Sequence, residues 1–108
     1  MPFNVFGNSG GAYVSDTIAA MLYAAGLSNE SGTIYTGSVP IKVVNLSLGS
    51  SGGSCGSSYR NSIQDVTNAG ITVVSSSGNE AVEAPGAYGY PASCENVISV
   101  GAVDPLNN

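Results

Sequence analysis

Four short apolar segments, separated mainly by helix-length stretches, most strongly limit the folds open to this chain. They span residues 1–6, 42–48, 71–76 and 97–102, and each has the length of a single strand. Parallel strands need long, usually helical connections, so the alternation favours a mostly parallel sheet. We therefore predict an α/β fold, a partial and mostly parallel sheet with flanking helices, in the order strand, helix, strand, helix, strand, strand. Because the helices are short and the sheet lacks neighbours, we expect the chain to be cut from a larger α/β domain.

Two of the intervening stretches have the period of an amphipathic helix. Ser15 can cap the first helix and Gly26 can end it. Its apolar residues recur at i, i+3, i+4 and i+7, and they are Ile18, Met21, Leu22 and Ala25. Ser57 or Ser58 can cap the second helix, which ends at Gly70. Its apolar face consists of Tyr59, Ile63 and Val66.

The charge and hydropathy of the chain argue against two kinds of partner. Only 8% of its 108 residues are charged, the net charge is −5, and Lys42 and Arg60 stand apart from each other. Because nothing basic is available to neutralise phosphates, we expect no nucleic acid partner. No apolar run approaches the ~18 residues that span a membrane, so we expect no membrane partner.

The composition favours a secreted, extracellular protein. Its polar residues are mainly Ser, Gly, Asn and Thr, a surface composition common in secreted bacterial enzymes. The first residues lack the basic and then apolar pattern of a signal peptide. We therefore expect a leader to lie upstream and Met1 to be an internal methionine.

Two cysteines, Cys55 and Cys94, each lie in a segment rich in serine and glycine. A four-ligand zinc site is excluded within this chain, because it contains no histidine and only two cysteines. A disulfide is favoured over two unrelated free thiols. Such a bond would place the protein in an oxidising compartment.

Small residues follow two of the predicted strands, at their carboxyl ends. One strand leads into residues 47–50, which read S-L-G-S, and the next leads into residues 75–80, which read S-S-S-G-N-E. Ligands of parallel sheets bind beyond the carboxyl ends of the strands, and small residues let a ligand backbone approach. Ordinary glycine-rich turns are the alternative. Two G-x-S-x-G matches, at 7–11 and 49–53, are attributed to chance, because a nucleophile elbow needs a histidine base.

Three segments in order carry a specific resemblance. They read V-V-N-L-S-L-G at 43–49, V-V-S-S-S-G-N-E at 73–80, and Y-P-A-S at 90–93 leading into N-V-I-S-V-G-A-V-D at 96–104. This pattern resembles the middle of the subtilisin-like serine proteases, the subtilase or peptidase S8 family. The opening M-P-F-N-V-F-G resembles the strand that follows the family's histidine helix. The resemblance implies that residues 1–108 are the central, incomplete part of a subtilisin-like peptidase domain with a three-layer fold.

The resemblance also implies roles for individual residues. Asn79 matches the asparagine whose carboxamide donates to the oxyanion of the tetrahedral intermediate. The strand end at 47–49 matches the edge that pairs with the substrate backbone. The implied substrate-binding residues are Ser47, Leu48, Gly49, Ser76, Ser77, Gly78 and Tyr90, with Ser75 and Pro91 beside them and Glu80 at the pocket rim.

Two departures from the family pattern stand out. None of the family's triad motifs is present, since its aspartate and histidine lie upstream and its serine lies downstream. The usual Ala-Ala before Gly-Asn is Ser76-Ser77, which makes the pocket wall more polar.

The family loops that contain Cys55 and Cys94 are neighbours, so the resemblance implies a disulfide between them that would brace the pocket. It also implies a possible structural calcium on the backbone carbonyls of Glu95 and Val97. No cofactor is required for the chemistry.

The implied function is that of a secreted serine endopeptidase whose Ser-His-Asp triad comes from outside this chain. Its partners would be a peptide or protein substrate and the remainder of the peptidase domain. Two alternatives stay open: a non-catalytic α/β module that only binds peptides, and an α/β domain that binds a small anion at its glycine-rich turns.

Overall fold

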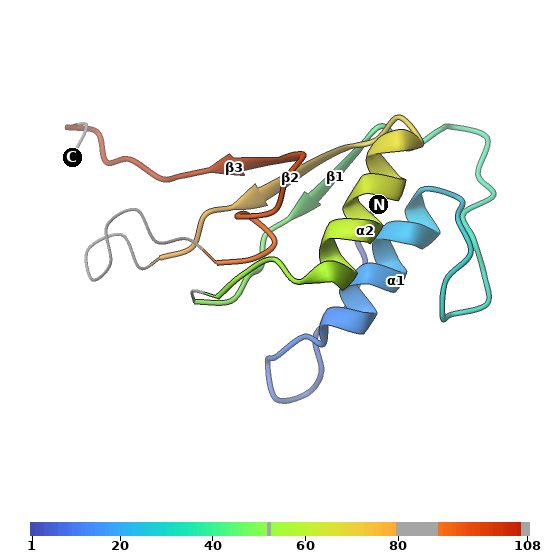
Figure 1. Cartoon of the computed structure of the whole chain (residues 1–108), viewed down its shortest axis with the longest axis horizontal. Coiled ribbons are helices and arrows are strands. Elements are labelled where there is room, and N and C mark those ends of the chain that lie inside the picture. The colour runs from blue at the N-terminus through green and yellow to red at the C-terminus, as the bar shows by residue number, and fades with distance from the viewer. Residues whose placement is uncertain (52, 80–88, 107–108) are drawn as a thin grey trace.

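The computed structural model describes residues 1–51, 53–79 and 89–106, and it places three parallel strands beside two helices (Figure 1). In chain order the elements are α1 (Val14–Ala24), β1 (Val43–Leu46), α2 (Ser57–Asn68), β2 (Thr72–Ser76) and β3 (Val97–Val100). The prediction of an α/β fold with a mostly parallel sheet is confirmed.

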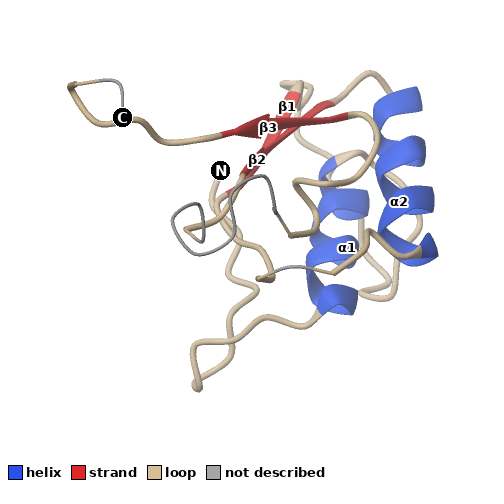
Figure 2. Cartoon of the chain, turned by 60° about the vertical axis from the view of Figure 1, so that its left-hand side comes forward, coloured by secondary structure: helices blue, strands red, loops and turns tan. Residues whose placement is uncertain are grey.

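The described sheet has the order β1-β2-β3, and both pairings are parallel. Val44 is opposite Val73, and Val74 is opposite Ile98. Both helices lie on the same side of this sheet (Figure 2), so the described residues form two layers. Neither described helix has the length and apolar character needed to cross a bilayer.

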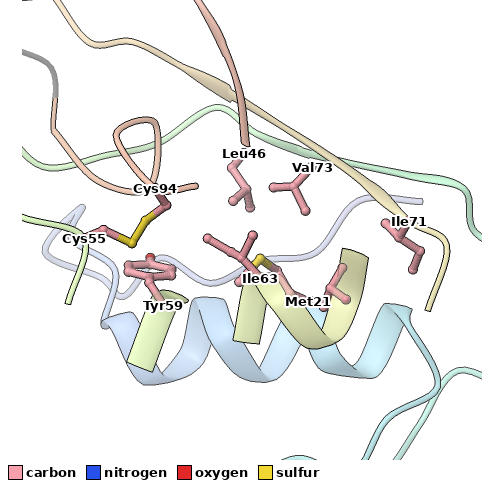
Figure 3. Close-up of a cluster of buried hydrophobic side chains, with 9 residues drawn as sticks. Met21, Leu46, Cys55, Tyr59, Ile63, Ile71, Val73 and Cys94 are labelled. Atoms are coloured by element: carbon pink, nitrogen blue, oxygen red, sulfur yellow. A yellow bond between two sulfur atoms is a disulfide. The ribbon is translucent and has the colours of Figure 1, made fainter. Parts of the chain in front are cut away.

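The core lies between the helices and the sheet, and α2 supplies its centre (Figure 3). Ile63 and Val66 of α2 are both 0% exposed, and Val73 of β2, also 0% exposed, packs in the same cluster. Burial of one such side chain contributes roughly 1.5–3 kcal/mol. The apolar face predicted for the second helix is therefore the face that holds α2 against the sheet.

The observed helix ends agree with the glycine stops predicted from the sequence, whereas the observed helix starts do not match the predicted serine caps. Gly26 and Gly70 follow α1 and α2 with φ of 71° and 90°, a backbone conformation that glycine adopts without strain. The residues before the helices are Tyr13 and Gly56, and neither makes a side-chain cap. The predicted serine caps are therefore wrong, because Ser15, Ser57 and Ser58 lie within the helices.

The predicted strand at residues 1–6 is also wrong for the described structure. The segment makes one isolated antiparallel bridge, between Phe6 and Ala12. The chain then turns back, since the Gly7 amide donates to the Gly11 carbonyl at 2.9 Å and the Gly10 amide donates to the Gly7 carbonyl at 3.0 Å. Strand composition yields a strand only where a partner backbone lies alongside.

Candidate functional site

The carboxyl ends of β1 and β2 lie next to each other at one edge of the sheet, because the two strands are parallel neighbours (Figure 1). Leu46 is paired with Ser75, so residues 47–49 leave the sheet beside residues 77–79. Each segment consists of small or polar residues apart from Leu48. This arrangement places two backbone segments and the Asn79 side chain around one space.

A cavity of about 400 Å³ opens at this edge. Its lining includes seven of the nine catalytic and substrate-binding residues that the resemblance implied: Ser47, Leu48, Gly49, Ser76, Gly78, Asn79 and Tyr90. They come from three separate stretches of the chain. The structure therefore brings together residues whose association the sequence alone could only imply.

Of the remaining two predicted residues, Ser77 does not line the cavity. Ser77 donates its amide to the Val100 carbonyl at 2.9 Å and lies against Gly101, so it belongs to the β2–β3 side. Glu80 lies outside the described residues. Ser75 is 0% exposed, and its hydroxyl donates to the carbonyl of Ser76, which lines the cavity.

Tyr90 forms one wall of the cavity through close backbone contacts. The Ser50 amide donates to the Tyr90 carbonyl at 3.1 Å, and a Cβ on Gly49 would come within 3.3 Å of the same oxygen. A Cβ on Gly89 would overlap the Ser50 carbonyl. The peptide bond between Tyr90 and Pro91 is cis. The backbone of Ser50 thus leaves no room for a side chain at Gly89, whereas a Cβ at Gly49 would require the Tyr90 wall to shift by a few tenths of an ångström.

A disulfide joins Cys55 to Cys94, with a Cα–Cα distance of 5.1 Å and a sequence separation of 39. Both cysteines are buried within the hydrophobic core. Tyr59 of α2 lies beside the bond (Figure 3). The disulfide thus connects the start of α2 to the segment that follows Tyr90.

Sequence reasoning missed several residues that line the same cavity: Phe6, Gly10, Gly11, Ala12, Val14, Thr17 and Tyr59. Residues 10–12 line the cavity from the turn that precedes α1. Thr17 is 2% exposed although it lies outside the apolar set that defined the first helix. Its position one residue before Ile18 was the only available signal, because a residue adjacent to an apolar face is often partly covered.

The cavity has little charge. Its described lining contains no carboxylate, amine or guanidinium, and its titratable groups are the phenols of Tyr59 and Tyr90. Burial raises the pKa of Tyr59, an interaction with the Thr17 side chain offsets part of this rise, and the nearby Tyr90 raises the pKa further. Tyr59 is therefore uncharged at neutral pH.

The geometry suits the binding of an extended polypeptide and the stabilisation of an oxyanion. The strand-edge backbone beyond β1 can pair with a peptide by β-augmentation. The exposed Asn79 carboxamide is a neutral N–H donor at the cavity. The chain contains no histidine, so it cannot itself supply a Ser-His-Asp triad.

The calcium prediction remains a prediction. The described residues contain no cluster of three or more acidic, cysteine or histidine side chains that could hold a metal. Glu95 is exposed in the turn before β3, and Val97 begins that strand. Asn96 between them has a φ of 65° and donates to the Gln64 side chain at 3.2 Å.

One family model and several known proteins match this chain along nearly its whole length. A family model described as the subtilase family, peptidase S8, matches residues 1–108. The chain is 40% identical over 102 residues to an extracellular protease of Xanthomonas campestris, covering 94% of the chain and 17% of that protein. It is 38% identical over 105 residues to an extracellular basic protease of Dichelobacter nodosus, covering 97% of the chain and 16% of that protein.

Solved structures agree with these relatives. A protease from Pseudoalteromonas arctica is 34% identical with a TM-score of 0.72, covering 86% of the chain and 26% of that structure. Sphericase is 28% identical with a TM-score of 0.73, covering 96% of the chain and 30% of that structure. The chain thus spans less than a third of each of these two structures. Since the family model matches every residue, this chain belongs to the subtilase family of peptidases.

Proposed function

We propose that the chain forms the substrate-binding and oxyanion-stabilising part of a secreted serine endopeptidase. One observation carries the proposal: Asn79, the 47–49 strand end and Tyr90 converge on a single cavity at the carboxyl ends of β1 and β2. A peptidase needs a backbone edge, a side-chain pocket and an oxyanion donor within reach of one scissile bond.

In the proposed mechanism the substrate backbone pairs with residues 47–49, and its side chain enters the space between this strand end and Tyr90. The serine of the parent domain attacks the carbonyl carbon, and a histidine held by an aspartate accepts the serine proton. The Asn79 carboxamide donates to the oxygen as it becomes negative. Residues outside this chain supply the triad, in keeping with its coverage of 16–17% of the two extracellular relatives.

Two features support secretion of the parent protein. The Cys55–Cys94 disulfide is the kind of bond that persists in oxidising compartments. The Xanthomonas and Dichelobacter relatives are both named as extracellular proteases.

The proposal is tested on the full-length protein that carries this segment. We expect the purified protein to degrade casein, and a serine-directed sulfonyl fluoride to abolish that activity with one adduct per chain. A protein that binds peptides near the cavity without cleaving them or reacting with the sulfonyl fluoride would contradict the proposal and support a peptide-binding module. Failure of both binding and cleavage would also contradict it.

A further inference from the structure

We propose that Tyr59 and the Cys55–Cys94 disulfide together position the Tyr90 wall of the cavity, and that Tyr59 is a positioning residue for substrate binding. We call this pair of connections the wall clamp. The inference rests on the proposed function, because it concerns which substrate side chains the cavity accepts.

The wall clamp joins residues 55–59 to residues 90–94, with one connection at each end of the two segments. Cys55 lies just before α2, and Tyr59 lies in the first turn of that helix. Cys94 and Tyr90 are likewise separated by four positions. The disulfide links one pair (Figure 3). The Tyr59 and Tyr90 rings link the other, at 5.7 Å between centroids with an interplanar angle of 53°. Two connections fix the direction of the Tyr90 segment as well as its distance from α2.

The clamp is anchored in the most buried part of the molecule. Tyr59 is 5% exposed and continues into the core through Ile63 on the next turn of α2. The Thr17 side chain of α1 lies beside its hydroxyl, and both residues line the cavity. Thr17 in turn donates to the Tyr13 carbonyl at 3.2 Å. Both helices therefore hold the Tyr59 ring in place.

Tyr90 depends on such contacts because it lies outside every described helix and strand. A Cβ on Gly53 would come within 3.3 Å of the Tyr90 ring. The Tyr90 carbonyl is held by the Ser50 amide at 3.1 Å. The distance between the 47–49 segment and the Tyr90 wall sets the width of the cavity. Loosening the clamp should therefore change which side chains fit there.

The sheet positions the proposed oxyanion donor. Asn79 follows β2, which the ladders to β1 and β3 hold on both sides. Loss of the clamp should consequently act on KM and on substrate preference, whereas kcat for a well-bound substrate should change little. If the wall clamp contributed only to stability, its loss would lower the melting temperature without changing the preference among substrate side chains.

The experiment uses the full-length enzyme and four variants. Tyr59→Leu and the double variant Cys55→Ala/Cys94→Ala each remove one connection, and Tyr59→Phe keeps the ring while removing the hydroxyl. Val66→Ala is the matched control, because Val66 is 0% exposed on the same helix and does not line the cavity. For each, kcat and KM are measured on peptides with Phe or Ala before the cleaved bond, alongside thermal melting.

We expect Tyr59→Leu and the double cysteine variant to raise KM for the Phe peptide about three- to tenfold, the affinity equivalent of one aromatic pair. The Phe-to-Ala preference should fall by a similar factor. Tyr59→Phe should keep the wild-type preference. Val66→Ala should melt at a lower temperature with the preference unchanged.

Hydrogen exchange at the Ser50 amide supplies a readout that does not require turnover. We expect faster exchange in both clamp variants and unchanged exchange in Val66→Ala. If the double cysteine variant fails to fold, the comparison of Tyr59→Leu with Tyr59→Phe decides. Unchanged preference and unchanged Ser50 exchange in a folded clamp variant would overturn the inference. A protein without peptidase activity would contradict the proposed function, while the exchange measurement would still test the clamp.

Discussion

At the scale of single residues, Gly49 illustrates how the absence of a side chain shapes the cavity. A Cβ at this position would lie 3.3 Å from the Tyr90 carbonyl oxygen, closer than most Cβ contacts. Any side chain would push the 47–49 segment and the Tyr90 wall apart. The width of the space proposed to receive the substrate side chain therefore depends on glycine here.

We expect Gly49→Ala in the full-length enzyme to raise KM roughly fivefold, since modest overpacking costs about 1 kcal/mol. Steady-state kinetics on a single chromogenic peptide measures this. Gly7→Ala is the control, because a Cβ there makes only an ordinary 3.8 Å contact and Gly7 does not line the cavity. Equal KM values for wild type and Gly49→Ala would contradict this prediction, because they would show that the Tyr90 wall accommodates the added methyl group without loss of affinity.

Ionisation of Tyr59 is expected to lower the stability of the folded protein at alkaline pH. Burial raises its pKa in the folded state, so folding favours the neutral phenol. This contribution to stability is complete below about pH 10, the pKa of an unperturbed tyrosine, and is lost as the pH rises through the folded-state pKa. Thermal melts from pH 8 to pH 11 should show wild type losing stability relative to Tyr59→Phe above pH 10. Parallel curves would contradict burial of the phenol.

The sequence predicted one group of cavity residues and missed another for a physical reason. Asn79 and residues 47–49 follow strands, and parallel strand ends always meet at one edge, so their association could be inferred. Thr17 and Tyr59 reach the same cavity from helices. Their approach depends on how α1 and α2 pack. The sequence places each residue on or beside the apolar face of its own helix, but it does not show that the two side chains share one cavity.

At the scale of elements, glycine predicted the helix ends because only a positive φ could terminate α1 and α2 there. The helix starts were mispredicted because no side chain caps them. The segment at 1–6 has strand composition but lacks a described ladder partner. Local sequence therefore predicted the helix ends, which depend on the conformation of a single glycine. It did not predict the structure of residues 1–6, which depends on whether a partner strand lies alongside.

The disulfide links two elements across 39 positions, and loop closure of that length contributes on the order of 3 to 4 kcal/mol in the chain-entropy model. We expect mass spectrometry of a non-reduced digest of secreted protein to find Cys55 and Cys94 in one cross-linked peptide pair. Alkylation should recover neither thiol before reduction. Two free, alkylatable thiols in the secreted protein would contradict the bond.

At the scale of the whole molecule, the proposed function divides substrate binding and bond cleavage between this chain and the rest of its domain. The chain holds a cavity, a strand edge and an amide donor, but it has no histidine. We expect the isolated 108-residue chain to show no turnover of casein or of a chromogenic peptide, because no base can activate a serine. Turnover that copurifies with the chain through successive columns would contradict this division.

The central claim is that Asn79 stabilises the oxyanion, and substitution of this one side chain tests it most directly. In the full-length enzyme, Asn79→Leu keeps the approximate volume while removing the N–H donor. The negative charge appears only as the serine attacks, so kcat should fall while KM changes little. The expected fall is about 10²–10³-fold, the size of the effect in subtilisin, a member of the same family.

The measurement is kcat and KM for Asn79→Leu and wild type on the same peptide, with thermal melting as the check on folding. The account predicts a variant that melts like wild type, binds substrate with nearly the same KM and turns it over at least about a hundred times more slowly. A correctly folded variant with wild-type kcat would show that Asn79 is only a turn residue, and the proposed role of the cavity in catalysis would be wrong.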